Sequence, residues 1–236
     1  MSLYESNFLI SNSEEMLQTI EDFYSKSLRE KEISIVLQLK IKHFLEDIKS
    51  ALDYAAFYIY KRYSKEFITA KPEDHERSVC FPVHFSEKRF NTVMENIFIN
   101  LNQANNEIIE TFKSVQPFVK SESWYTIFNQ LVNKNKHRYL TPQTKNQTTY
   151  INNLKAGPIE MVGCTVVGPS LNVSVDGNVF NLIDEKPNGL VEHIDAVTWV
   201  DFQFTELNLS VIPTLREILH ESTSLIKKLE VLIEKP

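Results

Sequence analysis

Glycine is scarce in this chain, and the five glycines that it has all lie after residue 156. Turns and tight bends most often need glycine, because it alone adopts left-handed backbone conformations without steric cost. Residues 1–155 are therefore predicted to form a helical bundle with short connections, and the turns are expected in the last third of the chain.

Cysteine is almost as rare, with only Cys80 and Cys164. Two thiols this far apart are more typical of a reduced, cytoplasmic protein than of a disulfide framework, although a single disulfide between them stays an open alternative. No stretch reaches the roughly 18 apolar residues of a membrane-spanning helix. The N-terminus also lacks the basic start and apolar run of a signal peptide. A cytoplasmic location without membrane contact is expected.

Basic residues are fewer than acidic ones. The chain has 25 Lys and Arg and 31 Asp and Glu, which gives a net charge of -6. Affinity for phosphates grows with the number of cations that a surface presents, so the chain as a whole is not expected to coat nucleic acid. A local basic patch can still bind RNA. The hydrophobic share of 42% suffices for a packed core and excludes a disordered chain.

Several motifs of known chemistry are absent from the sequence. It contains no CxxC or HExxH for a metal, no P-loop or GxGxxG for a nucleotide, and no GxSxG for a serine nucleophile. The prediction is a protein that needs no cofactor and holds no metal.

Helical periodicity dominates the first half of the chain. Residues 11–27 are predicted to form a helix opened by a capping box of Ser11 and Glu14. A second helix is expected over about 28–65, opened by Ser27 or Ser34. Its apolar stripe steps by three and four residues without interruption through Leu37, Ile41, Phe44, Ile48, Leu52, Ala55 and Ile59.

Asp53 lies inside the most apolar part of that second helix. It is interpreted either as a structural acid that a neighbouring donor satisfies or as a carboxylate that supports a site. The connector that follows, residues 66–85, contains Pro72 and Pro82, which exclude a continuous helix. Its charged piece at 71–77 is expected to be a solvent loop.

Two further helical segments are expected before the chain changes character. One begins at Ser86 and ends at Gln116-Pro117, with a break in the polar run 102–106, and the other starts near Glu122. Four amphipathic segments joined by short connections predict a helical bundle.

Beyond residue 140 the apolar period changes from helical spacing to two. The polar stretch 140–153 is predicted to be a linker or surface loop, and residues 156–205 an antiparallel β insertion with a hairpin turn at Asp176-Gly177. Residues 206–236 hold a last helix, expected from Val211 to Glu234, that packs back on the bundle. The fold class is therefore α+β and mainly α-helical.

The densest group of chemically useful side chains is Asn133-Lys134-Asn135-Lys136-His137-Arg138. On a helix, Asn133 and His137 share one face, and Lys134 and Arg138 form a neighbouring cationic row. An imidazole base beside cations suits the binding or cleavage of a phosphodiester. The alternative is structural, because cations near a helix C-terminus are favoured by the helix dipole, and His137 could hydrogen-bond Asp53.

Five pieces read in order carry a family resemblance: IKSALDYAAFYIYKRY (48–63), CFPVHFSEKRF (80–90), Gln116-Pro117-Phe118, WYTIFNQLVNKNKHRYLTP (124–142) and VTWVDFQF (197–204). They resemble a widespread group of uncharacterised bacterial proteins with an N-x-x-K-H-R motif. That group is distantly similar to the HEPN superfamily of helical-bundle proteins, many of which are dimeric, metal-independent ribonucleases in antiviral defence or toxin–antitoxin systems.

The resemblance implies a HEPN-like bundle and assigns roles to the cluster. His137, Arg138 and Asn133 would be catalytic, Lys134 and Lys136 would bind the substrate, and Asp53 would support them. The family signature is an arginine, then four to six residues, then the histidine, frequently with asparagine directly after the arginine. Here the arginine position is Val132, and Asn133 and His137 match the other two. The departure leaves two predictions open: a protein that binds or cleaves RNA, with a homodimer as its expected form, or a non-catalytic module that binds another protein.

Overall fold

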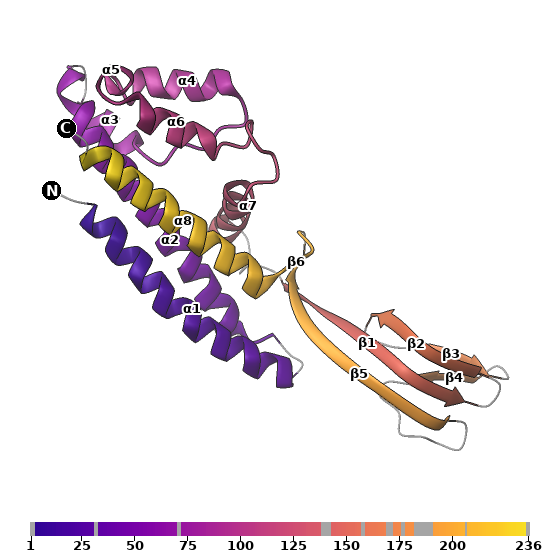
Figure 1. The fold of residues 1–236 in the computed structure, drawn as a ribbon. Helices are drawn as coiled ribbons and strands as arrows, with labels where there is room; N and C mark the ends of the chain where they lie inside the picture. Colours follow the sequence, from indigo (N-terminus) through magenta and orange to yellow (C-terminus); the bar gives the residue numbers. More distant parts are fainter. Residues whose placement is uncertain are drawn as a thin grey trace. The chain divides into compact units, whose positions relative to one another are not determined.

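The computed structural model describes residues 3–30, 33–69, 72–137, 143–156, 159–168, 172–175, 178–181, 191–205 and 207–234. The chain divides into two compact units, one of Met1–Tyr24, Ser34–Thr141 and Ile212–Pro236, and the other of Ser25–Ile33 and Pro142–Val211. Helices build the first unit, and antiparallel strands make up most of the second (Figure 1). The predicted α+β class is confirmed.

Three long helices frame the helical unit: α1 (Tyr4–Glu30), α2 (Ile35–Tyr63) and α8 (Val211–Glu234). Near the start of α1, Asn7 Nδ2 donates to Glu230 Oε1 on α8 at 3.1 Å. Further along, Arg216 Nε donates to Glu21 Oε1 at 2.8 Å. Early residues of α1 thus meet late residues of α8, so these helices run antiparallel. The last helix therefore contacts the first along its length.

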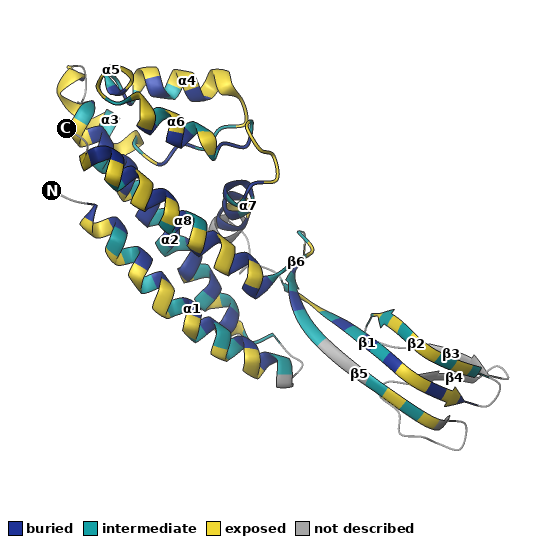
Figure 2. Ribbon diagram, viewed as in Figure 1, coloured by how far each residue is buried: buried dark blue, intermediate teal, exposed yellow. Residues whose placement is uncertain are grey.

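The buried seam of α1 repeats every seven residues, the spacing of coiled-coil packing. Serine occupies three of the buried positions of the helix, Ser6, Ser13 and Ser27, so the apolar pattern of the sequence marked only part of it. The helix begins at Tyr4, and Ser11 is an exposed residue inside it, so the predicted capping box at Ser11 was wrong. The seam consists of Leu3, Ser6, Ile10, Ser13, Leu17, Ile20 and Tyr24 (Figure 2).

The buried face of α2 is the apolar stripe that the sequence predicts. All seven stripe residues from Leu37 to Ile59 are fully buried. Ser34, one of the two predicted openers, is the N-cap: its Oγ accepts the backbone N–H of Leu37 at 3.1 Å. The cap satisfies a donor at a helix start that has no partner within the helix.

Shorter elements complete the helical unit. Ser86 caps the predicted third segment, accepting the N–H of Arg89 at 3.4 Å, and the expected break falls at Asn105. The charged piece predicted as a solvent loop is instead a helix, with Glu73 and Asp74 in its first turn, where the helix dipole favours acids. The elements are η1 (Lys65–Phe67), α3 (Pro72–Ser78), α4 (Glu87–Asn96), α5 (Leu101–Ala104), α6 (Asn106–Ser114) and α7 (Trp124–His137).

The strand unit contains a four-stranded antiparallel sheet in the order β2-β1-β5-β6 and a separate pair, β3 with β4. Val175 lies opposite Asn178, so the predicted hairpin is confirmed, although its turn residues Asp176 and Gly177 lie outside the described residues. The strands are β1 (Gln143–Ala156), β2 (Ile159–Val167), β3 (Asn172–Val175), β4 (Asn178–Asn181), β5 (Val191–Phe204) and β6 (Leu209–Ser210).

The first strand corrects the predicted linker. Residues 143–153, expected to form a loop, belong to β1, which pairs with β2 on one side and β5 on the other. The polar sequence concealed the strand because Gln147 and Thr149 take up buried positions that hydrophobic residues usually fill. The β-rich part thus begins about a strand's length before the predicted residue 156. Its core cluster is Ile151, Leu154 and Ala156.

Two features of the described fold concern the cysteines and the apolar length of the helices. Neither cysteine forms a disulfide, in agreement with two reduced thiols. Among the helices that the structure describes, none combines the length and the apolar character needed to cross a bilayer.

Candidate functional site

Helix α7 ends with residues 133–137 of the predicted cluster and is packed along most of its length. At its start, Ser123 Oγ accepts the backbone N–H of Thr126 at 3.2 Å. On its inner face, Tyr125, Phe128 and Leu131 are at most 1% exposed. The end of the helix that bears the cluster is therefore the continuation of a firmly anchored element.

The structure describes only part of the predicted cluster. Asn133 is an exposed residue of α7. The helix continues through Lys134 and Lys136 to His137, so positions 133 and 137 are one turn apart on one helix face. The side chains of those last three residues, and Arg138 as a whole, lie outside the described residues. Their convergence stays a prediction.

Val132, where the family signature has arginine, points into the core and is only 2% exposed. The adjoining Asn133 is exposed. An arginine at position 132 would therefore not share the surface of Asn133. The packing of α7 therefore leaves position 132 unsuited to a surface arginine.

Asp53, the predicted support residue, has Lys49 and Phe81 as its observed partners. Its Oδ1 accepts the backbone N–H of Phe81 at 2.8 Å and also pairs with Lys49 Nζ, one turn earlier on α2. Both partners are donors, and they satisfy the half-buried carboxylate. These contacts match the interpretation of Asp53 as a structural acid.

The same extended segment, residues 81–84, is held by two more side chains. Gln116, which is fully buried, donates from Nε2 to the carbonyl oxygen of Pro82 at 2.9 Å and accepts the N–H of His84 on Oε1 at 2.9 Å. The hydroxyl of Tyr125 also donates to Pro82, at 3.1 Å. We call Asp53, Gln116 and Tyr125 the backbone clamp, because each binds main-chain groups of one segment.

Burial and neighbouring charge shift two pKa values around the clamp. Burial raises the pKa of Tyr125 well above its ordinary 10.0, and the charge of Asp53 raises it further, while a hydrogen bond with Asn129 acts in the opposite direction. Burial lowers the pKa of His84 below its ordinary 6.5, with a further contribution from Arg89. Both shifts favour the neutral forms, as expected for groups withdrawn from water.

The backbone clamp and the predicted cluster lie at opposite ends of α7. Tyr125 belongs to the first turn and His137 ends the helix. At a rise of 1.5 Å per residue, their backbones are about 18 Å apart. Since Asp53 lies close enough to Tyr125 to affect its pKa, its observed partners belong to the clamp end of the helix. Sequence reasoning missed the clamp, although Gln116 and Asp53 both stand in the motifs quoted above.

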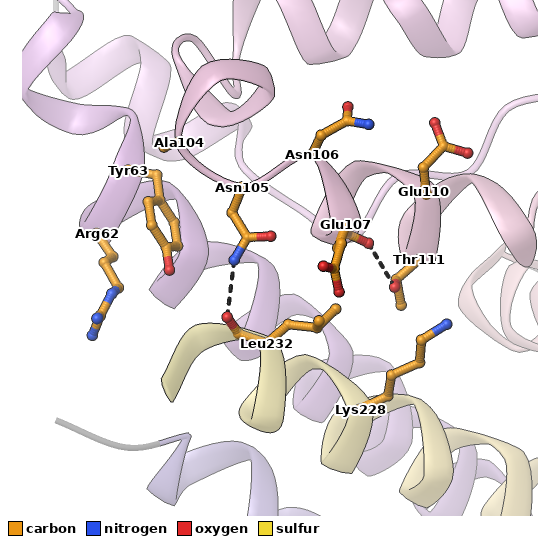
Figure 3. A pocket seen from close by; sticks show the side chains of 10 residues that line it. All are labelled: Arg62, Tyr63, Ala104, Asn105, Asn106, Glu107, Glu110, Thr111, Lys228 and Leu232. Carbon is orange, nitrogen blue, oxygen red and sulfur yellow. Dashed lines mark hydrogen bonds between the residues drawn. The ribbon is translucent and has the colours of Figure 1, made fainter. Parts of the chain in front are cut away.

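A pocket of about 730 Å³ opens between the end of α2, the α5–α6 junction and α8 (Figure 3). Asn105 crosses it, donating from Nδ2 to the carbonyl oxygen of Leu232 at 2.9 Å. Arg62 and Lys228 line the pocket together with Glu107 and Glu110. Because its cations and carboxylates balance, the pocket has no electrostatic preference for phosphate.

A second pocket, of about 400 Å³, lies along α4, α5 and α6. Glu95 and Glu110 line it, and its lining contains no lysine or arginine. This pocket would repel a phosphodiester. Neither pocket thus has the positive charge that the sequence predicts for the end of α7.

Among the residues that the structure describes, no group of three or more His, Cys, Asp or Glu side chains is placed to hold a metal ion. Comparison of the chain with protein-family models, with curated proteins and with solved structures found no match.

Proposed function

We propose that this chain is a HEPN-like protein that binds RNA and cleaves it without a metal at the C-terminal end of α7. The observation that supports this best is the course of α7: an anchored helix that carries exposed Asn133 one turn before His137. Residues on one helix face can contact the same phosphodiester. The resemblance in motif order supports the same assignment.

The proposed chemistry is an internal transesterification. His137, as a neutral imidazole, takes the proton of a ribose 2′-hydroxyl, and the 2′-oxygen attacks the adjacent phosphorus. The bond to the 5′-oxygen breaks, water gives a proton to that leaving oxygen, and the hydroxide so formed takes the proton from the His137 imidazolium. A 2′,3′-cyclic phosphate remains. Lys134, Lys136 and Arg138 would offset the charge that develops on the phosphate, and Asn133 would donate a hydrogen bond to it.

The setting follows from the resemblance. A metal-independent ribonuclease of this kind would act in the cytoplasm of a bacterium, in antiviral defence or within a toxin–antitoxin pair. A homodimer would be its expected oligomeric state.

Two observations favour a second candidate function, a non-catalytic module that binds another protein. The buried Val132 removes the signature arginine from the surface of α7, and the net charge of -6 weakens general affinity for RNA. In this alternative the cluster would contact a protein partner.

The test incubates purified protein with total RNA in the presence of a metal chelator. Wild type is expected to release fragments that end in 2′,3′-cyclic phosphate, and His137→Ala is expected to release none. His220→Ala, which changes an exposed histidine on α8, is the matched control and should cleave like wild type. Absence of cleavage by wild type, or equal cleavage by His137→Ala, would remove the catalytic claim.

Binding is tested separately by fluorescence anisotropy with labelled single-stranded RNA at several salt concentrations. Each phosphate contact that is lost should reduce the slope of log affinity against log salt by about 0.7. Replacing Lys134 and Lys136 by alanine should therefore lower the slope. Tight, salt-dependent binding without cleavage would favour an RNA-binding protein, and no binding would favour the protein-interaction alternative.

A further inference from the structure

The pocket of about 730 Å³ at the end of α2 combines two cations with an aromatic ring (Figure 3). Arg62 Cζ lies 5.6 Å from the centroid of the Tyr63 ring, close enough for a cation–π contact. Lys228 of α8 lines the same pocket. Within the described part of the chain, neither cation forms an ion pair with a carboxylate. Both cations can therefore bind an anionic group of a ligand.

Carboxylates line the same pocket. Glu107 and Glu110 belong to α6, and the Glu107 side chain points from α6 towards α8 (Figure 3). Because they balance the cations, a bare phosphate gains little there. A nucleotide differs from a bare phosphate, since its base also presents hydrogen-bond donors. Carboxylates accept from the amino group of cytosine, and unpaired bases are recognised at that edge. The mixture of charges thus matches a ligand with an anionic group and an amino group.

Flat surfaces distinguish a nucleotide from other ligands that carry both groups. Unpaired RNA bases stack on aromatic rings and on the plane of an arginine guanidinium. Tyr63 and Arg62 supply one surface of each kind at the pocket. The Asn106 carboxamide, also in the lining, has both a donor and an acceptor for a base or a sugar. These groups together favour a nucleotide over a small amino acid.

The last turns of α2 extend the aromatic surface beyond the pocket. Residues 54–63 read YAAFYIYKRY, with five aromatic residues, two cations and no acid. Tyr54 is 51% exposed. Tyr54, Tyr58 and Arg62 follow one another at intervals of one turn, about 6 Å along the helix axis. Bases next to a nucleotide in the pocket can therefore meet further rings, which favours an oligonucleotide over a free nucleotide.

We propose that this pocket binds one nucleotide of single-stranded RNA and prefers a base that carries an amino group. Arg62 and Lys228 bind phosphates, and the base stacks on Tyr63. Glu107 and Glu110 accept hydrogen bonds from the amino group. The inference rests on the RNA-binding function proposed above, but it assigns recognition to a surface other than the end of α7. A free nucleotide has the same chemistry, and the experiment separates it from RNA.

The test measures fluorescence anisotropy with labelled oligonucleotides of cytidine, adenosine and uridine. Their 2′-O-methyl form prevents attack by the 2′-oxygen, so the probe is not cleaved. Wild type is expected to bind the cytidine and adenosine probes more tightly than the uridine probe, whose base lacks an amino group. Arg62→Ala and Lys228→Ala should each weaken binding of all three by about tenfold. Lys227→Ala, at an exposed cation of α8 outside the pocket lining, is the matched control and should bind like wild type.

The carboxylates give the most discriminating measurement. A double variant, Glu107→Ala with Glu110→Ala, removes two negative charges, and by charge alone it should tighten binding of every probe to the same extent. The proposal instead expects the preference for cytidine and adenosine over uridine to disappear. Tyr54→Ala should weaken binding of the oligonucleotides and leave binding of cytidine monophosphate unchanged. Circular dichroism of each variant verifies that it is folded.

The possible outcomes separate this inference from the proposed function. Wild-type affinity and base preference in the pocket variants, together with RNA cleavage by wild type, would overturn this inference alone. A wild type that neither binds nor cleaves RNA would overturn the proposed function as well. Cytidine monophosphate might bind as tightly as the oligonucleotide and lose that binding in the same variants; this result would assign the pocket to a free nucleotide and overturn the RNA claim.

Discussion

Gln116 holds Pro82 from 34 positions away in the sequence, with 2.9 Å between Gln116 Nε2 and the carbonyl oxygen of Pro82. The same carboxamide accepts the N–H of His84 at 2.9 Å. One buried side chain thus satisfies a donor and an acceptor of a segment that has no strand partner of its own. This relationship makes Gln116 the central member of the backbone clamp.

Replacing Gln116 by leucine should destabilise the helical unit. The substitution leaves the N–H of His84 without its partner, while Pro82 keeps its bond from Tyr125. A buried group that loses its partner costs about 2 kcal/mol of unfolding free energy. Urea unfolding measures the loss. Gln130→Leu, at an exposed position of α7, is the control and should stay within about 0.5 kcal/mol of wild type.

Tyr125 should make the protein sensitive to alkaline pH. Its folded-state pKa is raised, so the folded chain keeps the phenol proton where the unfolded chain has lost it. Its contribution to stability is therefore complete below about pH 10 and declines as the pH rises towards the folded-state pKa.

Unfolding free energies at about pH 8 and about pH 11 test this expectation. Tyr125→Phe should be about 1 kcal/mol less stable at the lower pH, because it lacks the bond to Pro82. It should then lose less than wild type on going to the higher pH. Tyr54→Phe, at a residue that is 51% exposed, should follow wild type. Equal losses in all three proteins would contradict the role of Tyr125.

Introducing an arginine at position 132 should damage the fold. Val132→Arg places a charge at a position that is 2% exposed, and an uncompensated buried charge costs about 3 kcal/mol or more. Asn133→Arg, the neighbouring exposed position, should fold like wild type. Thermal and urea unfolding compare the two variants. A Val132→Arg protein with wild-type stability and new ribonuclease activity would show that position 132 can reach the surface.

Replacement by alanine should change the free energy of unfolding differently at two serines. Ser34→Ala removes the oxygen that accepts the N–H of Leu37 and should cost about 1 kcal/mol. Ser11 lies exposed inside α1, so Ser11→Ala should be neutral or stabilising by up to about 0.5 kcal/mol. Urea unfolding of both variants checks the assignment. A loss at Ser11 equal to that at Ser34 would reinstate the predicted capping box.

Much of the helical unit could be predicted from local pattern. The stripe from Leu37 to Ile59 and the last helix from Val211 to Glu234 appear where the apolar period predicts them, because each helix buries one face. Prediction was wrong where buried positions are polar. Ser6 and Ser13 lie in the seam of α1, and Gln147 and Thr149 face inward from β1, so hydrophobic periodicity did not mark those parts.

The sequence by itself determined the long helices that bury one apolar face, the hairpin between Val175 and Asn178, and the run of cations next to His137 along the chain. Tertiary structure decided what Asp53, Gln116 and Tyr125 do. Asp53, Gln116 and Tyr125 lie 28, 34 and 43 positions from the backbone groups that they bind, and no local period encodes such partners. Tertiary packing also decided that Val132 faces the core, because the face of α7 that is buried depends on the helices around it.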